Sequence, residues 1–279
     1  MINLTSQLSK IEEQKKLYRI LLNKSRHQSE LKNQVWYNAA ELASSFDLTI
    51  GADSALLQER NRKGLLEAFQ TIRFSPKICL DLSFIKTVHA QALAFSNPCQ
   101  GGVFRRMRAR WLNSSMVVSN WEKIPWLMEG LVDGINQEHI PAFYWEEHPN
   151  ILFQKFAHYP VMQAIESNYN TVAIHPFADG NKRAARLVSA WILDKYGHIP
   201  LSIYDREAYL LGVENYYRTR EPQLLYAVMF DQMRKSYDHA ICDIKAMEKR
   251  YFPANLHMPA HRKHRSRLIP SNVRQSCLI

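Results

Sequence analysis

The chain contains little glycine and no long hydrophobic run. Only 9 of its 279 residues are glycine, and alternating apolar segments between turn signals are few, which argues against an all-β fold. No stretch approaches the roughly 20 apolar residues that a membrane-spanning helix needs, and residues 1–10 lack the apolar core of a secretory signal. We therefore expect a mostly α-helical protein without a transmembrane segment, located in the cytoplasm.

Cysteine is also scarce. The four cysteines have no CxxC spacing, and 46% hydrophobic content provides enough apolar surface for a core without covalent staples. We expect free thiols rather than disulfides or a zinc site. The cysteines are Cys79, Cys99, Cys242 and Cys277.

Charge is unevenly distributed. From Lys249 onward there are seven Lys or Arg residues and no Asp or Glu, out of a formal net charge of +10. Such an end could attract nucleic acid or an anionic membrane, serve as a C-terminal export signal into another cell, or only aid solubility. Nucleic acid is the least expected partner, because no helix-turn-helix or RNA-binding motif accompanies the basic residues. We divide the chain into an N-terminal helical region that packs on the core (1–75), a central domain (76–240) and a basic tail (241–279).

Residues 175–186, His-Pro-Phe-Ala-Asp-Gly-Asn-Lys-Arg-Ala-Ala-Arg, gather unusual chemistry. Pro176 and Gly180 are typical of a short loop. The apolar spacing after residue 186 then predicts a helix that begins near Gly180. The first N–H groups of a helix lack intrahelical acceptors and its dipole is positive there, so this end can bind phosphate.

The side chains of this segment fit the same chemistry. Arg183 and Arg186 lie three residues apart on one helical face, where each can bind phosphate oxygens. Asp179 offers the hard oxygen that Mg²⁺ prefers beside substrate phosphates. His175 can accept a proton at neutral pH. Each residue alone is better explained as an N-cap, a solvated charge or a core histidine, whereas the whole set within twelve residues favours a site.

The pattern H-P-F-x-D-G-N-x-R-x-x-R resembles the signature of the Fic (Fido) family, whose members most often transfer AMP from ATP to a hydroxyl side chain of a protein. The resemblance covers roughly residues 80–235. It implies a Fic-like helical bundle with a β-hairpin flap, and a protein adenylyltransferase that uses Mg²⁺, with ATP as co-substrate and a target protein bearing a hydroxyl side chain.

The resemblance also implies individual roles. His175 would be the general base, Asp179 would position Mg²⁺, and Phe177 would point into the core. The nucleotide would be held by Gly180, Asn181, Lys182, Arg183 and Arg186, the last facing the γ-phosphate.

Lys182 departs from the commonest form of the motif, which has Gly there. The Doc toxin branch of the fold also carries Lys at this place and transfers phosphate instead of AMP. Phosphate transfer, or transfer of another nucleotide-derived group, is therefore the alternative reaction. A catalytically silent binding scaffold is a further alternative, against which the intact His175, Asp179, Asn181 and Arg183 argue.

Residues 102–105, Gly-Val-Phe-Arg, and the following run to Ser119 are similar to the segment that builds the family's target-binding flap. We predict a hairpin whose turn, Asn113, Ser114 and Ser115 with Met116, binds an extended target segment as an added strand. The alternative is a solvated hairpin whose arginines only keep its edge soluble.

Many Fic enzymes are restrained by a helix carrying Ser or Thr, three spacers, Glu, then Gly or Asn. The chain has no intact copy. The nearest segments, 9–14 and 55–60, contain Glu13 and Glu59 at the relevant place, and we interpret both as ordinary surface charges. An inhibitory antitoxin-like partner is thus left open.

Overall fold

The computed structural model describes residues 3–46, 54–76, 78–110, 116–137 and 159–251, and the regular elements in these ranges are helices joined by loops. Two short 3₁₀ turns, η1 (Pro98–Gln100) and η2 (Trp121–Lys123), accompany the α-helices. The helices are α1 (Leu4–Lys24), α2 (Gln28–Phe46), α3 (Ser54–Phe74), α4 (Leu82–Leu93), α5 (Ile124–Asn136), α7 (Pro160–Ile174), α8 (Asn181–Lys195), α9 (Arg206–Thr219) and α10 (Gln223–Tyr251). The predicted mostly α fold is confirmed.

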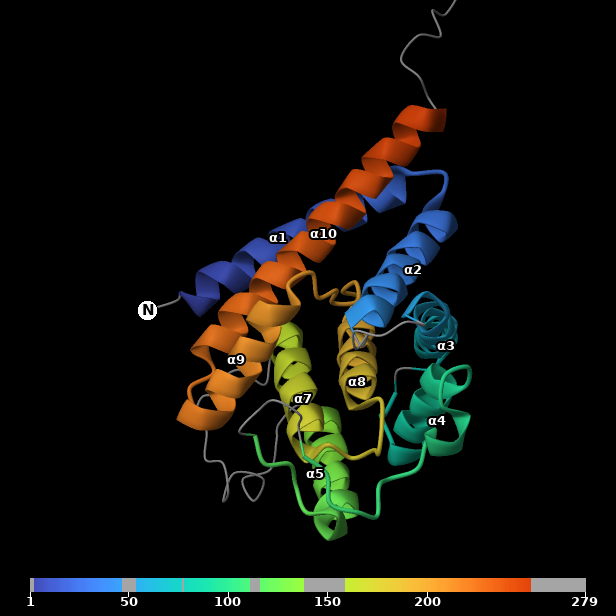
Figure 1. The fold of residues 1–279 in the computed structure, drawn as a ribbon. Coiled ribbons are helices and arrows are strands. Elements are labelled where there is room, and N and C mark those ends of the chain that lie inside the picture. The colour runs from blue at the N-terminus through green and yellow to red at the C-terminus, as the bar shows by residue number, and fades with distance from the viewer. Residues whose placement is uncertain (1–2, 47–53, 77, 111–115, 138–158, 252–279) are drawn as a thin grey trace, which may run out of the picture.

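Helices α7 and α8 pack side by side at the centre, and the loop between them carries the motif (Figure 1). Small residues such as Ala164 and Ala185 face the core and let the two helices approach closely. The Ser189 hydroxyl donates a 2.9 Å hydrogen bond to the Ala164 carbonyl across this interface. Because the two helices are almost wholly buried, the loop that joins them is held at both ends by the most rigid part of the fold.

The N-terminal helices pack on different parts of the rest of the fold. Helix α3 contacts both α4 and α8, while α1 runs along α10 (Figure 1). The buried His198 ring, which follows α8, ties α1 to α10: its Nε2 lies 3.2 Å from Glu12 Oε1, and its Nδ1 lies 3.0 Å from the Tyr237 hydroxyl. Residues before position 76 therefore pack on the rest of the molecule and reach its central helix.

Helix α10 runs on to Tyr251, past the boundary at 240/241 where the sequence placed the start of the basic tail. Ile241 and Ile244 are buried and anchor this part of the helix. Residues 241–251 are thus helical, and most of the basic tail, 252–279, lies outside the described residues.

Cys79, Cys99 and Cys242 are free thiols, as the sequence predicts, and Cys277 lies outside the described residues. Among the helices that the structure describes, none combines the length and the apolar character that crossing a membrane requires.

Candidate functional site

The loop after α7 turns at His175, the C-cap residue of that helix. His175 has left-handed backbone angles, φ 54° and ψ 59°, and its N–H donates to the Thr171 carbonyl at 3.1 Å. A residue with a Cβ adopts this conformation at a cost of the order of 1 kcal/mol or more, so neighbouring contacts must hold it. The left-handed turn redirects the chain away from the axis of α7 at the first residue of the motif.

Asn181 closes the loop. Its side-chain Oδ1 accepts from the Phe177 N–H at 2.8 Å, and its Nδ2 donates to the Phe177 carbonyl at 2.8 Å. Phe177 itself is fully buried, as the resemblance implies. Because the Asn181 amide is engaged with the loop at both ends, contact between this residue and a phosphate would have to come from its backbone N–H.

Gly180 is the N-cap of α8 and also has a left-handed backbone, with φ 74°. A Cβ at this position would lie 2.8 Å from the His89 Nε2 atom. The helix begins at Asn181, as the spacing predicts. Glycine is required here both for the turn and for the close approach of His89.

A hollow of about 380 Å³ opens in front of this loop. It brings together six of the residues that the sequence singles out: His175, Asp179, Gly180, Asn181, Lys182 and Arg183. Arg186 lies one turn further along α8, is only 5% exposed, and is not among the lining residues. The remaining lining residues are Leu57 and Asn61 of α3, Ser96 and Asn97 after α4, and Ala178.

Arg183 is buried and lies at the centre of a polar network. Its Nη1 donates to Asn61 Oδ1 at 2.8 Å and to Ser96 Oγ at 3.2 Å, while its Nη2 lies 3.4 Å from both carboxylate oxygens of Asp179. The Asp179 side chain is 45% exposed and also accepts from the Gly180 N–H at 2.6 Å. An accessible carboxylate and a guanidinium therefore meet beside the N-terminus of α8.

His175 is held neutral at physiological pH. Burial lowers its pKa to about 4, and the nearby positive charge of Arg105 acts in the same direction. A neutral imidazole can accept a proton, which is the role that the sequence predicts for it.

The family model described as "Fic/DOC family" matches residues 79–193, which include this loop and hollow. Curated relatives named "Protein adenylyltransferase Fic" match over 167 residues, at 26% identity in Drosophila erecta and 27% in Drosophila virilis. Residues 79–193 form a Fic/DOC family domain.

The Fic relatives are longer than the matched region. The match covers 59% of this chain but only 30% of the Drosophila erecta protein and 31% of the Drosophila virilis protein. Among solved structures, Fic-1 (aa134 - 508) from C. elegans covers 88% of this chain with a TM-score of 0.64 at 16% identity, 73% of that chain being matched. A Fic domain containing signaling protein from Bacteroides thetaiotaomicron covers 86% with a TM-score of 0.61 at 18% identity, 97% of that chain being matched. These likenesses support the Fic-like helical fold.

The predicted Fic flap is not present as a hairpin in the described residues. Residues 103–110 and 116–119 contain no strand; the one β contact there is an isolated bridge between Phe104 and Phe177. Both arms instead hydrogen-bond to the end of α7 and the loop: the Arg105 N–H donates to the Pro176 carbonyl, and the Ser119 N–H donates to the Ala173 carbonyl. Backbone carbonyls that would accept the hydrogen bonds of a β-ladder instead accept hydrogen bonds from the Arg105 side chain.

The turn residues Asn113, Ser114 and Ser115 lie outside the described residues. Met116 is 2% exposed and belongs to the hydrophobic core, so its side chain offers no surface to a target.

His89 of α4 supports the Fic loop, although the sequence gave it no role. Its ring stacks on Phe177 with centroids 3.6 Å apart. Gly102 N–H donates to its Nδ1 at 3.0 Å, so the ring proton is on Nε2, which lies 3.0 Å from the Asp179 carbonyl and donates to it. Burial lowers the pKa of His89 to about 4, consistent with a neutral ring that makes these two hydrogen bonds.

Glu13 and Glu59 do not contact the Fic arginines. Glu59 pairs with Arg62 at 2.6 Å and with Lys63 at 3.8 Å, while Glu13 accepts from the Ser9 hydroxyl at 3.5 Å. Both glutamates are surface charges, as predicted. On α3, Asn61 accepts a hydrogen bond from Arg183 of the motif.

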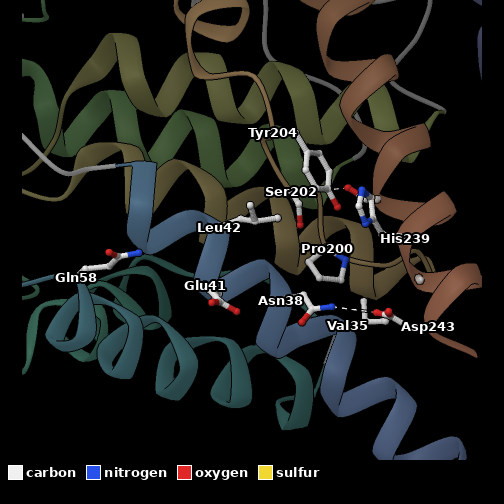
Figure 2. A pocket seen from close by; sticks show the side chains of 12 residues that line it. Val35, Asn38, Glu41, Leu42, Gln58, Pro200, Ser202, Tyr204, His239 and Asp243 are labelled. Atoms are coloured by element: carbon white, nitrogen blue, oxygen red, sulfur yellow. Dashed lines mark hydrogen bonds between the residues drawn. The ribbon is translucent and has the colours of Figure 1, made fainter. Parts of the chain in front are cut away.

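A second hollow of about 480 Å³ lies between α2, α10 and the segment after α8 (Figure 2). It is lined by the Glu41 and Asp243 carboxylates, and Tyr204 stacks on His239 at its edge. No Lys or Arg is among its described lining residues. The two carboxylates in its lining repel phosphate, so the Fic hollow is the better candidate for a nucleotide.

Proposed function

We propose that this Fic protein is a protein adenylyltransferase, which moves AMP from ATP to a serine, threonine or tyrosine hydroxyl of a target protein. The observation that carries the proposal is that a neutral His175 and the Asp179 carboxylate line the same hollow as the N-terminus of α8. The names of the curated relatives point to the same reaction.

His175 acts first on the acceptor. It removes the hydroxyl proton as the oxygen attacks the α-phosphorus of ATP, so that a P–O bond to the target forms and the bond to the departing pyrophosphate breaks. The proton remains on the imidazole until it is released to solvent. Backbone N–H groups at the start of α8, with Arg183, bind the phosphates and hold the reacting phosphorus in line.

Asp179 fits a Mg²⁺ site. The ion takes one or two carboxylates together with substrate phosphates, and Asp179 supplies one exposed carboxylate on the pocket wall. When bound, Mg²⁺ would neutralise charge on the phosphates and the leaving pyrophosphate.

Transfer of phosphate instead of AMP is the second candidate. Lys182 lines the hollow, and its charge contributes to the low pKa of His175, so its ammonium lies near the reacting groups. A cation there could draw the nucleotide along by one phosphate and present the γ-phosphorus to the hydroxyl.

The deciding experiment incubates the protein with lysate and with ATP labelled separately at the α- and γ-phosphates, followed by mass measurement of modified peptides. We expect an added AMP with the native protein and none with His175→Ala, which retains nucleotide binding. An added phosphate would support the second candidate. No modification with any nucleotide donor would support a silent scaffold and count against both reactions.

Target and regulation are part of the proposal. The target is a protein bearing a hydroxyl side chain. An inhibitory antitoxin-like partner would supply the inhibition that segments 9–14 and 55–60 do not.

Fractionation of the producing cell and of recipient cells distinguishes a cytoplasmic protein from one exported through its basic C-terminal segment.

A further inference from the structure

Arg105 is a buried cation whose described partners are all backbone carbonyls. The residue is 4% exposed. Its Nε donates to the His175 carbonyl at 2.7 Å, and its Nη2 lies 3.5 Å from the Ile174 carbonyl. These oxygens are at the C-terminal end of α7, where the helix dipole is negative and a cation is stabilised.

The same guanidinium also holds two further segments. Nη1 donates to the Met107 carbonyl at 2.7 Å, and Nη2 donates to the Ser119 carbonyl at 2.5 Å. Met107 belongs to the first arm, residues 105–110, and Ser119 belongs to the second arm, residues 116–119. One side chain therefore joins the catalytic loop to both arms of the segment that leads to and from residues 111–115.

Burial lowers the pKa of Arg105, and in the described part of the chain no carboxylate pairs with it. A buried charge of this kind is costly unless several dipoles satisfy it. The planar guanidinium suits this arrangement because it directs several N–H groups along fixed directions at once, which an ammonium cannot do.

We propose that Arg105 is a positioning residue that sets the left-handed backbone at His175 and the spacing of the two arms together. Resting on the proposed function, this means that seating of a target segment on the arms and placement of the catalytic base are coupled through one side chain. A shift of either arm moves the guanidinium, and with it the carbonyl of His175.

The first test compares Arg105→Lys with Arg106→Lys. Arg106 is the exposed neighbour on the same arm, so its variant controls for a general loss of arginine. We expect Arg105→Lys to lower kcat roughly ten- to a hundred-fold and to raise KM for the target, because several charge-assisted hydrogen bonds are lost. KM for ATP should stay within about twofold, because Arg105 does not line the nucleotide hollow. An equal fall in kcat in the two variants, or a rise in KM for ATP alone, would overturn the proposal.

The second test does not depend on activity. Hydrogen exchange is measured at the N–H groups of His175, Ser119 and Arg105, which bond to Thr171, Ala173 and Pro176. We expect all three to exchange roughly ten-fold faster or more in Arg105→Lys, and none to change in Arg106→Lys. Faster exchange in one arm with His175 unchanged would refute the coupling.

The two tests separate the proposals. If the native protein transfers nothing but the three amides respond together, the proposed function fails and the positioning role stands. If transfer is normal in Arg105→Lys and its amides are unchanged, the positioning role fails and the proposed function stands. Arg105→Gln, which keeps a donor toward the His175 carbonyl, is measured in the same way should the lysine variant melt below the assay temperature.

Discussion

Asn61 on α3 accepts a 2.8 Å hydrogen bond from the Arg183 guanidinium on α8, across 122 positions of the chain. Both side chains are buried, at 3% and 4% exposure. The bond fixes Nη1 of an arginine that lines the hollow beside the motif loop, and it makes α3 part of that site.

Asn61→Ala is expected to weaken ATP binding about three- to ten-fold, because Arg183 would lose one charge-assisted hydrogen bond and would be less well oriented toward the phosphates. Isothermal titration with ATP measures the effect. Arg60→Ala, at an exposed position on the same helix, serves as the control and should bind like the native protein. Tighter binding in Asn61→Ala would mean that Asn61 competes with the phosphates for Arg183.

Gly180→Ala is expected to destabilise the protein by about 2–4 kcal/mol. A left-handed backbone costs an L-residue ~1–2 kcal/mol, and the new Cβ would lie 2.8 Å from the buried His89 Nε2 atom. Gly197→Ala is a matched control, because Gly197 has a similar φ of 70° but nothing within 4 Å of its Cβ position. Urea denaturation should therefore show a larger loss of unfolding free energy for Gly180→Ala than for Gly197→Ala. Equal losses would exclude the contact with His89 as a cause.

Glu166→Gln is expected to flatten the pH dependence of stability. Burial raises the pKa of Glu166 to about 7, although hydrogen bonds from Tyr226 and Tyr216 oppose the shift. Between pH 4.5 and 7 the carboxyl is protonated in the folded chain and ionised in the unfolded one, so the native protein loses stability as pH rises through this window. The loss is at most about 3 kcal/mol. Urea midpoints from pH 4.5 to 8 measure it.

The exposed Glu221→Gln serves as the control for the Glu166 series. Its stability should follow the native pH profile. A Glu166→Gln profile with the native slope would show that other groups cause the pH dependence.

Lys182→Gly is expected to leave AMP transfer intact or to raise it. Glycine at this position is the commoner form of the family motif, and its smaller size leaves more room beside the phosphates. Mass measurement of the modified target identifies the transferred group in both proteins. A change from phosphate in the native protein to AMP in the variant would show that the native reaction is phosphate transfer.

The sequence revealed the part of the site that is continuous in the chain. His175 and residues 178–183 line one hollow because a short loop and a helix start bring neighbours together. Asn61 and His89 come from distant helices, where a single polar residue in an apolar pattern does not differ from an ordinary helix residue. Their roles depend on how α3 and α4 pack against α8, which periodicity does not specify.

The hairpin prediction failed in the described arms for a related reason. Alternating apolar residues indicate an extended chain but do not identify the partner of that chain. Here the extended arms bond to the loop after α7, and Arg105, which only the alternative interpretation counted among arginines that keep a hairpin edge soluble, is buried between them. Likewise, the basic composition near residue 249 did not indicate that α10 extends to Tyr251.

The 3.4 Å pair of Asp179 and Arg183 has a thermodynamic consequence for how the hollow would fill. The group suited to a cation and the group suited to a phosphate form an ion pair with each other. Mg²⁺ alone would have to draw Asp179 from its arginine, and a nucleotide alone would have to draw Arg183 from its carboxylate. When both enter, each ligand releases the residue that the other needs, so their binding free energies should be positively coupled and each should raise the affinity for the other by the same factor.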